Sequence, residues 1–311
     1  MRAKLTRIVG WTVAIGLLAL IFWRIDVHQV LVALHTAAWW TFPVAATLLL
    51  GNFLADCFAT WKIFGWFTGP LVFRELMQVR GASYLLAMIN YSLGQGALVY
   101  YVHRARQTPV MRAVATVLLM MGSNLLLLLA LTSVGLLVST DATPTLRTVV
   151  QIAYAGLAVY AITMAIKPRW LERRELFRVL MTAGLRGHLG AMLVRLPHVM
   201  ILIAINYVVL RGFGVDVTLV QAVVRLPAVF FISALPISVQ GLGTSQAMMI
   251  LLFAPFVTGP REIQEATVLA ASLGYQALGT SFQVLFGLIF LRSPVVRDLR
   301  RSPSPTAATK P

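Results

Sequence analysis

Long apolar stretches, separated by short polar or basic links, make up most of the chain between residues 8 and 291. An α-helix needs about 20 apolar residues to cross the hydrocarbon core of a bilayer, and several stretches reach or approach that length. The pattern therefore predicts an all-α polytopic membrane protein with about six full transmembrane helices. The predicted spans are 8–23, 41–61, 113–138, 148–166 and 189–210, with a sixth that follows Glu265 and ends at Leu291.

Two further apolar regions are interrupted by residues that break helices. Region 80–101 contains Asn-Tyr-Ser-Leu-Gly-Gln-Gly, and region 217–257 contains Leu-Pro-Ile-Ser-Val-Gln-Gly-Leu-Gly-Thr-Ser-Gln. At membrane depth such breaks leave backbone groups without helical partners, so they must be buried in protein or line a wet cavity. We therefore predict two broken or re-entrant hairpins, which bring the number of hydrophobic segments to 8.

The distribution of charge predicts the orientation of these segments. The chain has 26 Lys and Arg against 10 Asp and Glu. Cytoplasmic loops carry the excess of Lys and Arg, so both termini and the basic connector 167–186 are predicted to face the cytoplasm of a bacterial-type inner membrane. The loops predicted to be external hold four cations and five acids: 24–40, 139–147, 211–217 and 258–265. This assignment holds only if region 80–101 enters and leaves the membrane on the cytoplasmic side.

The same pattern predicts how the chain is organised. We expect one membrane domain, 1–291, and a basic Pro- and Ser-rich tail, 292–311, that is disordered. Half one, 41–166, and half two, 187–291, would each hold one broken region. Both breaks contain Gly-x-Gly with an Arg 14 or 16 residues earlier, and they open to opposite faces, as an inverted-topology repeat predicts. For the second break, an ordinary loop between helices or two full spans are the alternatives.

Polar residues in and near the two breaks are the candidate substrate-binding residues, because hydrocarbon does not tolerate them without a partner. They are Arg80, Asn90, Ser92, Gln95, Arg225, Ser238, Gln240, Gln246 and Gln276. The residues expected to form the turns are Gly94, Gly96, Pro236, Gly241 and Gly243. A guanidinium can bind a lipid phosphate through two parallel hydrogen bonds, so Arg80 and Arg225 are assigned to an anionic headgroup. The alternative for both is extension of the charged group to the interface, or capping of a half-helix.

Other polar residues within the predicted spans have structural explanations. Asp56 is expected to form an ion pair with Lys62 or Arg80, with proton relay as the alternative. Arg195 is expected to reach the interface, because it lies closer to the end of its predicted span. Asn124 is expected to contribute a hydrogen bond between helices.

Composition argues against other classes of protein. Hydrophobic residues make up 59% of the chain and charged residues 12%, the balance of a polytopic membrane protein. On a soluble chain the excess of Arg would suggest nucleic acid, whereas cations between spans suit anionic lipid headgroups. The sequence shows no metal-ligand cluster, phosphate-binding loop or nucleophile motif. We therefore expect no metal, no cofactor and no enzymatic activity, and the single Cys57 excludes a disulfide framework.

The two breaks resemble a known family. Pro236-x-Ser238-x-x-Gly241-x-Gly243 and the first turn before an Arg-rich link are similar to those of the flippase-like membrane domain of lysylphosphatidylglycerol synthases, over about residues 7–292. The resemblance implies a stand-alone member, related to proteins of hopanoid and glycolipid pathways, without the aminoacyl-transferase domain. Family members usually carry a carboxylate after each glycine turn, where this chain has Ala97 and Gln246.

Together these observations predict a flippase-like lipid transporter that moves a polar-headed lipid, anionic or isoprenoid, between leaflets. Without the family's carboxylates, we expect Arg80 and Arg225 to hold an anionic headgroup in a water-accessible cavity, with neutral donors from Ser92, Ser238 and Gln246. A non-transporting subunit or scaffold for lipid or glycolipid biosynthesis is the first alternative, and an integral-membrane lipid-modifying enzyme is the second. The expected partners are membrane lipids, enzymes of lipid biosynthesis and further copies of the chain, with no nucleic acid.

The predicted orientation can be tested with single cysteines in a Cys57→Ser background. Arg106→Cys and Arg174→Cys should react with a membrane-impermeant thiol reagent only from the cytoplasm, because both lie in basic links. Asp141→Cys and Asp216→Cys should react only from outside. External labelling at position 106 would mean that region 80–101 crosses the membrane.

Overall fold

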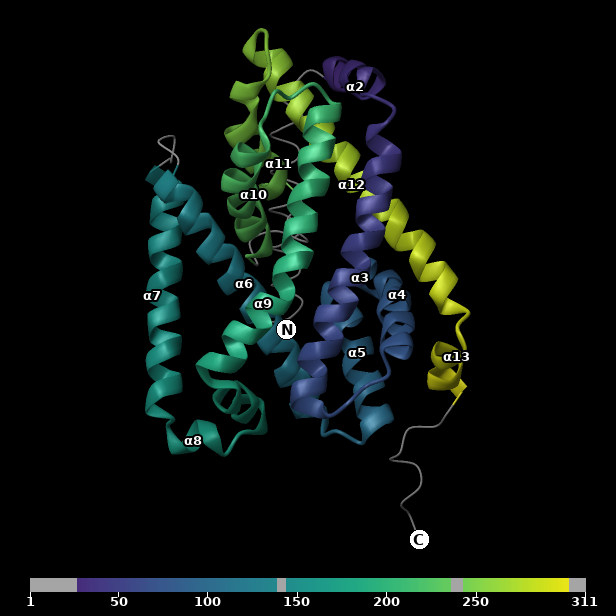
Figure 1. Cartoon of the computed structure of the whole chain (residues 1–311), viewed down its shortest axis with the longest axis vertical. Coiled ribbons are helices and arrows are strands. Elements are labelled where there is room, and N and C mark those ends of the chain that lie inside the picture. Colours follow the sequence, from purple (N-terminus) through teal and green to yellow (C-terminus); the bar gives the residue numbers. More distant parts are fainter. Residues whose placement is uncertain (1–26, 139–143, 236–242, 302–311) are drawn as a thin grey trace, which may run out of the picture. The chain divides into compact units, whose positions relative to one another are not determined.

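The computed structural model describes residues 27–138, 144–235 and 243–301, and every regular element in these ranges is a helix (Figure 1). Five helices are long and apolar enough to cross a membrane: α3 Thr41–Thr68, α6 Val110–Val138, α7 Pro144–Ile166, α9 Glu175–Gly212 and α12 Arg261–Leu291. They confirm five of the six predicted spans. The first predicted span, 8–23, lies outside the described residues.

The other described helices are shorter. They are α2 Val27–Thr36, α4 Phe73–Ile89, α5 Tyr91–Arg106, α8 Arg169–Glu172, α10 Leu219–Ala234, α11 Thr244–Phe253, the 3₁₀ turn η2 Ala254–Phe256 and α13 Pro294–Arg301. The presence of α13 corrects the prediction that the tail is disordered from residue 292. Val296 is buried while Arg297 is exposed, and α13 contacts α4. An amphipathic segment becomes helical when its apolar side has a surface to pack against.

The basic connector 167–186 is largely helical. It consists of α8 and the first turns of α9, and α9 kinks at Gly184, which has a φ of 53°. This left-handed conformation favours glycine, because a side chain would crowd the backbone. The long helix that the sequence predicts from residue 189 therefore starts within the connector, at Glu175.

Two compact units can be distinguished, and each is described by itself. The first unit comprises Met1–Phe53, Met121–Lys167 and Arg195–Gly279, and the second comprises Leu54–Met120, Pro168–Val194 and Thr280–Pro311. The boundaries fall inside α3, α6, α9 and α12, so each of these helices contributes a segment to both units. Among the described loops, those predicted to be external belong to the first unit. Those predicted to be cytoplasmic belong to the second unit, apart from Lys167.

The order of elements along the chain repeats. A long helix, a pair of short helices and another long helix follow one another as α3, α4–α5 and α6, and again as α9, α10–α11 and α12. In both pairs an arginine lies nine residues before the end of the first helix. These are Arg80 in α4, which ends at Ile89, and Arg225 in α10, which ends at Ala234.

The first pair, α4–α5, belongs to the second unit, and a single residue, Asn90, joins its two helices. Asn90 is extended, and its Oδ1 accepts a hydrogen bond from the Ser92 backbone N–H at 2.7 Å, which caps the start of α5. The expected turn at Gly94 and Gly96 is therefore corrected, because both glycines lie inside α5. A Cβ on Gly94 would lie 2.7 Å from the Cβ of Ala87, so this glycine allows α4 and α5 to approach closely.

The second pair, α10–α11, belongs to the first unit, and its two helices contact each other. Residues 236–242, which include the predicted turn residues Pro236 and Gly241, lie outside the described residues. Gly243 precedes α11 with a φ of 81°, a conformation suited to glycine. A Cβ on Gly135 of α6 would overlap the carbonyl oxygen of Val224, so α6 and α10 are in close contact at this glycine.

The different environments of Gly94 and Gly96 predict different effects of the same substitution. Gly94→Ala should destabilise the protein by about 1–3 kcal/mol, because the added methyl group would overpack against α4. Gly96→Ala is the matched control in the same helix, since an added Cβ there has no heavy atom within 4 Å. Thermal unfolding in detergent measures both effects. Equal melting temperatures for the two variants would show that α4 and α5 do not meet at Gly94.

Candidate functional site

A buried ion pair joins α3 to α4 in the second unit. Arg80 Nε donates to Asp56 Oδ2 at 2.7 Å, and the two side chains are only 11% and 4% exposed. The guanidinium also lies near the ring of Tyr84, with 5.7 Å between Cζ and the ring centroid. Removing one partner of a buried pair leaves an uncompensated charge, which is strongly unfavourable. Asp56 and Arg80 therefore hold α4 against α3.

This ion pair decides between the two partners expected for Asp56. Arg80 binds it, whereas the ammonium group of Lys62 lies 4.8 Å from the centroid of the Trp61 ring. The structure also corrects the expectation that Arg80 has no anionic competitor for a bound headgroup. The carboxylate that the glycine turn lacks is supplied by Asp56 from the preceding long helix.

Side chains near the break in the first pair differ in exposure. Ser92 is exposed, whereas Gln95 is only 6% exposed. Oε1 of Gln95 has no hydrogen-bond partner in the part of the chain that the structure describes. Access of water to these two residues stays a prediction. Gln95 is a buried acceptor within the second unit.

A second polar contact links the two helices of this pair. Tyr101 of α5 donates its hydroxyl proton to Oε2 of Glu75 on α4, with 2.9 Å between the oxygens. Both residues lie closer to the outer ends of their helices than to Asn90. The hydrogen bond of Glu75 therefore joins α4 and α5 near the ends that lie away from Asn90. The Asn90 cap stabilises the start of α5, where the two helices are joined.

In the second pair, two candidate residues lie at opposite ends. Arg225 places its guanidinium 4.9 Å from the ring centroid of Phe256, the last residue of η2. Gln246, at the start of α11, accepts hydrogen bonds at Oε1 from the Gly243 N–H at 2.7 Å and from the Ser245 hydroxyl at 3.0 Å. Ten residues of helix rise by about 15 Å, so Gln246 and Phe256 lie at opposite ends of the segment formed by α11 and η2.

Gln246 was predicted to donate a hydrogen bond to substrate, but in the structure its side chain caps α11. Its side chain is only 1% exposed, and its oxygen caps α11. A capping side chain three residues into a helix is commonly Glu or Gln, so Gln246 does what a glutamate would do at this position without its charge.

The remaining candidates are less constrained. Ser238 and Gln240 lie outside the described residues. Gln276 is half-buried on α12, one turn after the buried Ser272. Arg80 and Arg225 belong to different units, so a headgroup held between them remains a prediction.

The sequence pattern placed Arg195 wrongly. This arginine is only 7% exposed, and its Nε donates to Oδ1 of Asn124 on α6 at 3.1 Å, which confirms the hydrogen bond expected of Asn124. Arg195 does not reach an interface, because α9 is longer than the predicted span. The helix continues for seventeen residues after Arg195. An arginine and an asparagine in two separate apolar spans are the signal that could have suggested this contact.

The described residues offer no metal site of the usual kind. In residues 27–138, 144–235 and 243–301, no group of three His, Cys, Asp or Glu side chains could hold a metal ion.

The ion pair of Asp56 and Arg80 predicts a large effect on stability. Asp56→Ala should destabilise the protein by about 3–5 kcal/mol, because it leaves a buried guanidinium without its carboxylate. The double variant Asp56→Leu with Arg80→Met should recover most of that loss. Thermal unfolding in detergent, compared with the wild type, measures both effects.

The matched control is an exposed ion pair with similar geometry. Arg261 Nε lies 2.6 Å from Glu265 Oε1 at the start of α12, and the arginine side chain is 87% exposed. Glu265→Ala should leave the melting temperature unchanged, because solvent screens exposed charges. If Asp56→Ala and Glu265→Ala have equally small effects, the ion pair does not hold α4 in place.

Comparison with known families agrees with this arrangement of long and short helices. The family described as the lysylphosphatidylglycerol synthase TM region matches residues 7–287, which is most of the chain. Comparisons with curated proteins and with solved structures give no match. This family is one of membrane proteins related to lipid biosynthesis or lipid flipping. With its apolar helices and a match over nearly its whole length, the chain belongs to the lysylphosphatidylglycerol synthase transmembrane-region family.

Proposed function

We propose that this protein moves a polar-headed lipid, anionic or isoprenoid, between the two leaflets of a bacterial-type cytoplasmic membrane. The observation that carries the proposal is the presence of two pairs of helices too short to cross a bilayer. Discontinuous helices of this kind are where many transporters bind their substrates, because broken backbone at membrane depth must line a cavity or be buried in protein.

The lengths of the short helices support re-entrant hairpins. With 17, 16, 16 and 10 residues, α4, α5, α10 and α11 rise by about 26, 24, 24 and 15 Å, against a hydrocarbon core of about 30 Å. Both loops that flank α4–α5 belong to the second unit, and both loops that flank α10–α11 belong to the first. Each pair is therefore expected to return to the side from which it enters.

The repeated order of elements supports an inverted repeat. Each half contains a long helix, a short pair and a long helix, and each pair carries an arginine nine residues before the end of its first helix. The loops that flank the two pairs lie in opposite units, and these units hold loops of opposite predicted orientation. Transporters built this way alternate access by moving one repeat against the other.

A non-transporting scaffold for lipid biosynthesis is the second candidate, and one observation favours it. The connector presents a row of exposed cations together with Trp170, which is 70% exposed. These cations are Lys167, Arg169, Arg173, Arg174 and Arg178. Such a surface could dock an acidic enzyme as well as anionic headgroups. Transport distinguishes the two candidates, because a scaffold requires none.

The test is an exchange assay in proteoliposomes. Phosphatidylglycerol labelled on its acyl chain would be mixed into vesicles of phosphatidylethanolamine and phosphatidylglycerol, and dithionite would bleach the label in the outer leaflet. Protein-containing vesicles should lose nearly all fluorescence, with or without an imposed proton gradient, whereas empty vesicles keep the inner-leaflet fraction. Protection of that fraction under both conditions would contradict transport and leave the scaffold as the better explanation.

Arg225 provides a variant for the same assay. Arg225→Gln should abolish exchange with little effect on folding, and Arg225→Lys should restore only part of it, because the bidentate guanidinium is lost. Arg261→Gln removes an exposed arginine from the same unit and should leave exchange unchanged. Full exchange by Arg225→Gln would make this arginine structural and remove it from the substrate site.

A further inference from the structure

Segments of three long helices that belong to the first unit bring polar side chains together in otherwise apolar surroundings. Arg195 of α9 donates from Nε to Oδ1 of Asn124 on α6 at 3.1 Å. His198, three residues further along α9, has its Nδ1 3.4 Å from the carbonyl oxygen of Asn52 on α3. Residues three apart share one side of a helix, so Arg195 and His198 point toward α6 and α3 from neighbouring turns.

Arg195 lies deep in its helix. It lies eleven positions after the kink at Gly184 and seventeen positions before the end of α9 at Gly212. Its side chain is surrounded by protein, with 7% of the residue exposed. A long arginine side chain can carry its charge to the interface from near a helix end, but here the charged group stays among the helices. Ionisable residues held inside a membrane protein in this way commonly mark a pathway for substrate.

Two further polar atoms on α6 and α3 have unused hydrogen-bonding capacity. Ser123, next to Asn124 on α6, is fully buried, and its Oγ has no hydrogen-bond partner among residues 27–138, 144–235 and 243–301. Within the same ranges, Oδ1 of Asn52 also has none. Buried polar atoms without partners are rare, and these two can bind a group that the described residues do not supply. A hydroxyl can donate, whereas an amide oxygen can only accept.

We propose that Arg195, Ser123 and Asn52 form an intramembrane site for the phosphoryl group and the adjoining hydroxyl of an anionic lipid headgroup. The proposal rests on the proposed lipid transport and names a binding site for it that the breaks at Asn90 and Gly243 do not include. The guanidinium of Arg195 provides charge and several N–H donors for phosphoryl oxygens, and Ser123 adds a neutral donor. Oδ1 of Asn52 accepts from a headgroup hydroxyl.

Asn124 acts as a positioning residue in this site. Its amide oxygen carries no net charge, so its hydrogen bond orients the guanidinium without neutralising it. A carboxylate at position 124 would bind Arg195 more strongly and compete with an anionic headgroup. Asn124→Asp should therefore weaken binding of the lipid, although it preserves the size of the side chain.

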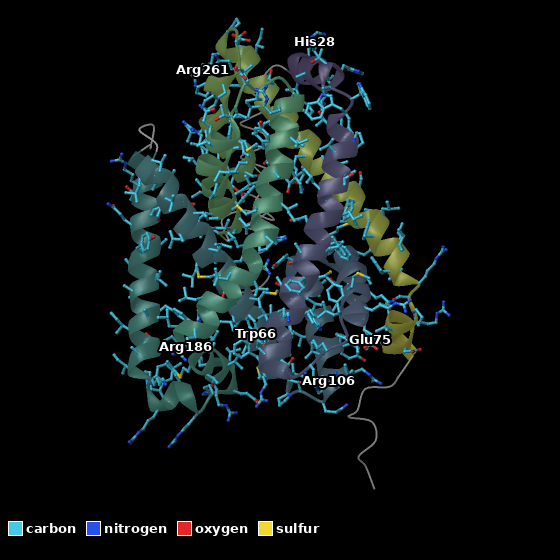
Figure 2. The ribbon with its side chains drawn as sticks, in the orientation of Figure 1. His28, Trp66, Glu75, Arg106, Arg186 and Arg261 are labelled. Atoms are coloured by element: carbon cyan, nitrogen blue, oxygen red, sulfur yellow. The ribbon has the colours of Figure 1, made fainter. Side chains whose placement is uncertain are left out.

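The experiment compares lipid retention by two arginine variants on one helix. Wild-type protein, Arg195→Gln and Arg186→Gln would be purified from membranes, exchanged into mixed micelles with equal phosphatidylglycerol and phosphatidylcholine, and analysed by native mass spectrometry. Arg186 is exposed, so its loss removes the same charge from the surface of α9 (Figure 2). Arg195→Gln should reduce the preference for phosphatidylglycerol by about tenfold or more, since charge-assisted hydrogen bonds are lost, and Arg186→Gln should not. An unchanged preference in Arg195→Gln would overturn the site.

A second measurement uses the wild-type protein, in case Arg195→Gln does not fold. Phosphatidylglycerol with a photoreactive group on its headgroup should attach to peptides that contain Ser123 or Arg195. Attachment confined to exposed positions of α7 and α12 would overturn the proposal. Excess inorganic phosphate tests the source of the phosphoryl group. Loss of attachment would assign the site to a soluble phosphate and overturn the lipid assignment, whereas persistence supports the lipid.

Binding and transport can fail independently in these experiments. If the wild type binds phosphatidylglycerol through Arg195 but exchanges no lipid between leaflets, the site stands and the proposed transport falls. If Arg195→Gln stops exchange while its preference for phosphatidylglycerol is unchanged, transport stands and this site falls.

Discussion

Backbone hydrogen bonding in a medium without water is the constraint on which this structure depends. A continuous helix satisfies its own N–H and C=O groups, and five long helices meet the requirement in that way. The two short pairs cannot, so each break needs a partner from a side chain. Asn90 supplies its amide oxygen to the start of α5, and Gln246 supplies its amide oxygen to the start of α11. The two breaks, far apart in sequence, are thus capped by the same chemical group.

The three arginines within the helices have different partners. Arg80 is held by a carboxylate from α3, and Arg195 is oriented by an amide from α6, while Arg225 lies over the aromatic ring of Phe256. An arginine at the centre of a membrane helix costs about 2.5–3.5 kcal/mol on the insertion scale. Asp56 offsets that cost for Arg80, so we assign Arg80 a structural role in holding α4 against α3. Arg195 has the neutral amide of Asn124 as a hydrogen-bond partner, and this difference in partners is why the two arginines are assigned different roles.

The sequence predicted the long helices well, because twenty apolar residues have few other stable arrangements in a bilayer. It misplaced the first break, since glycine is a breaker by its conformational freedom but is tolerated inside a helix where Gly94 meets Ala87. The helix α13 was missed because its stability comes from packing on α4, which local composition does not reveal. The Asp56–Arg80 pair was one of the two pairings predicted for Asp56, since a buried carboxylate needs a cation. The depth of Arg195 was not, because it depends on where α9 begins and kinks.

The cap of α11 has a consequence for how the protein responds to acidity. A glutamate at position 246 could make the same hydrogen bond to Gly243, but its carboxylate would gain a proton as the surroundings became acidic, and the cap would weaken. The amide of Gln246 has no proton to gain in that range, so it accepts the Gly243 hydrogen bond equally at any physiological pH. The start of this short helix is therefore insensitive to a proton gradient. If transport in this protein responds to protons, the titrating group must lie elsewhere than at this break.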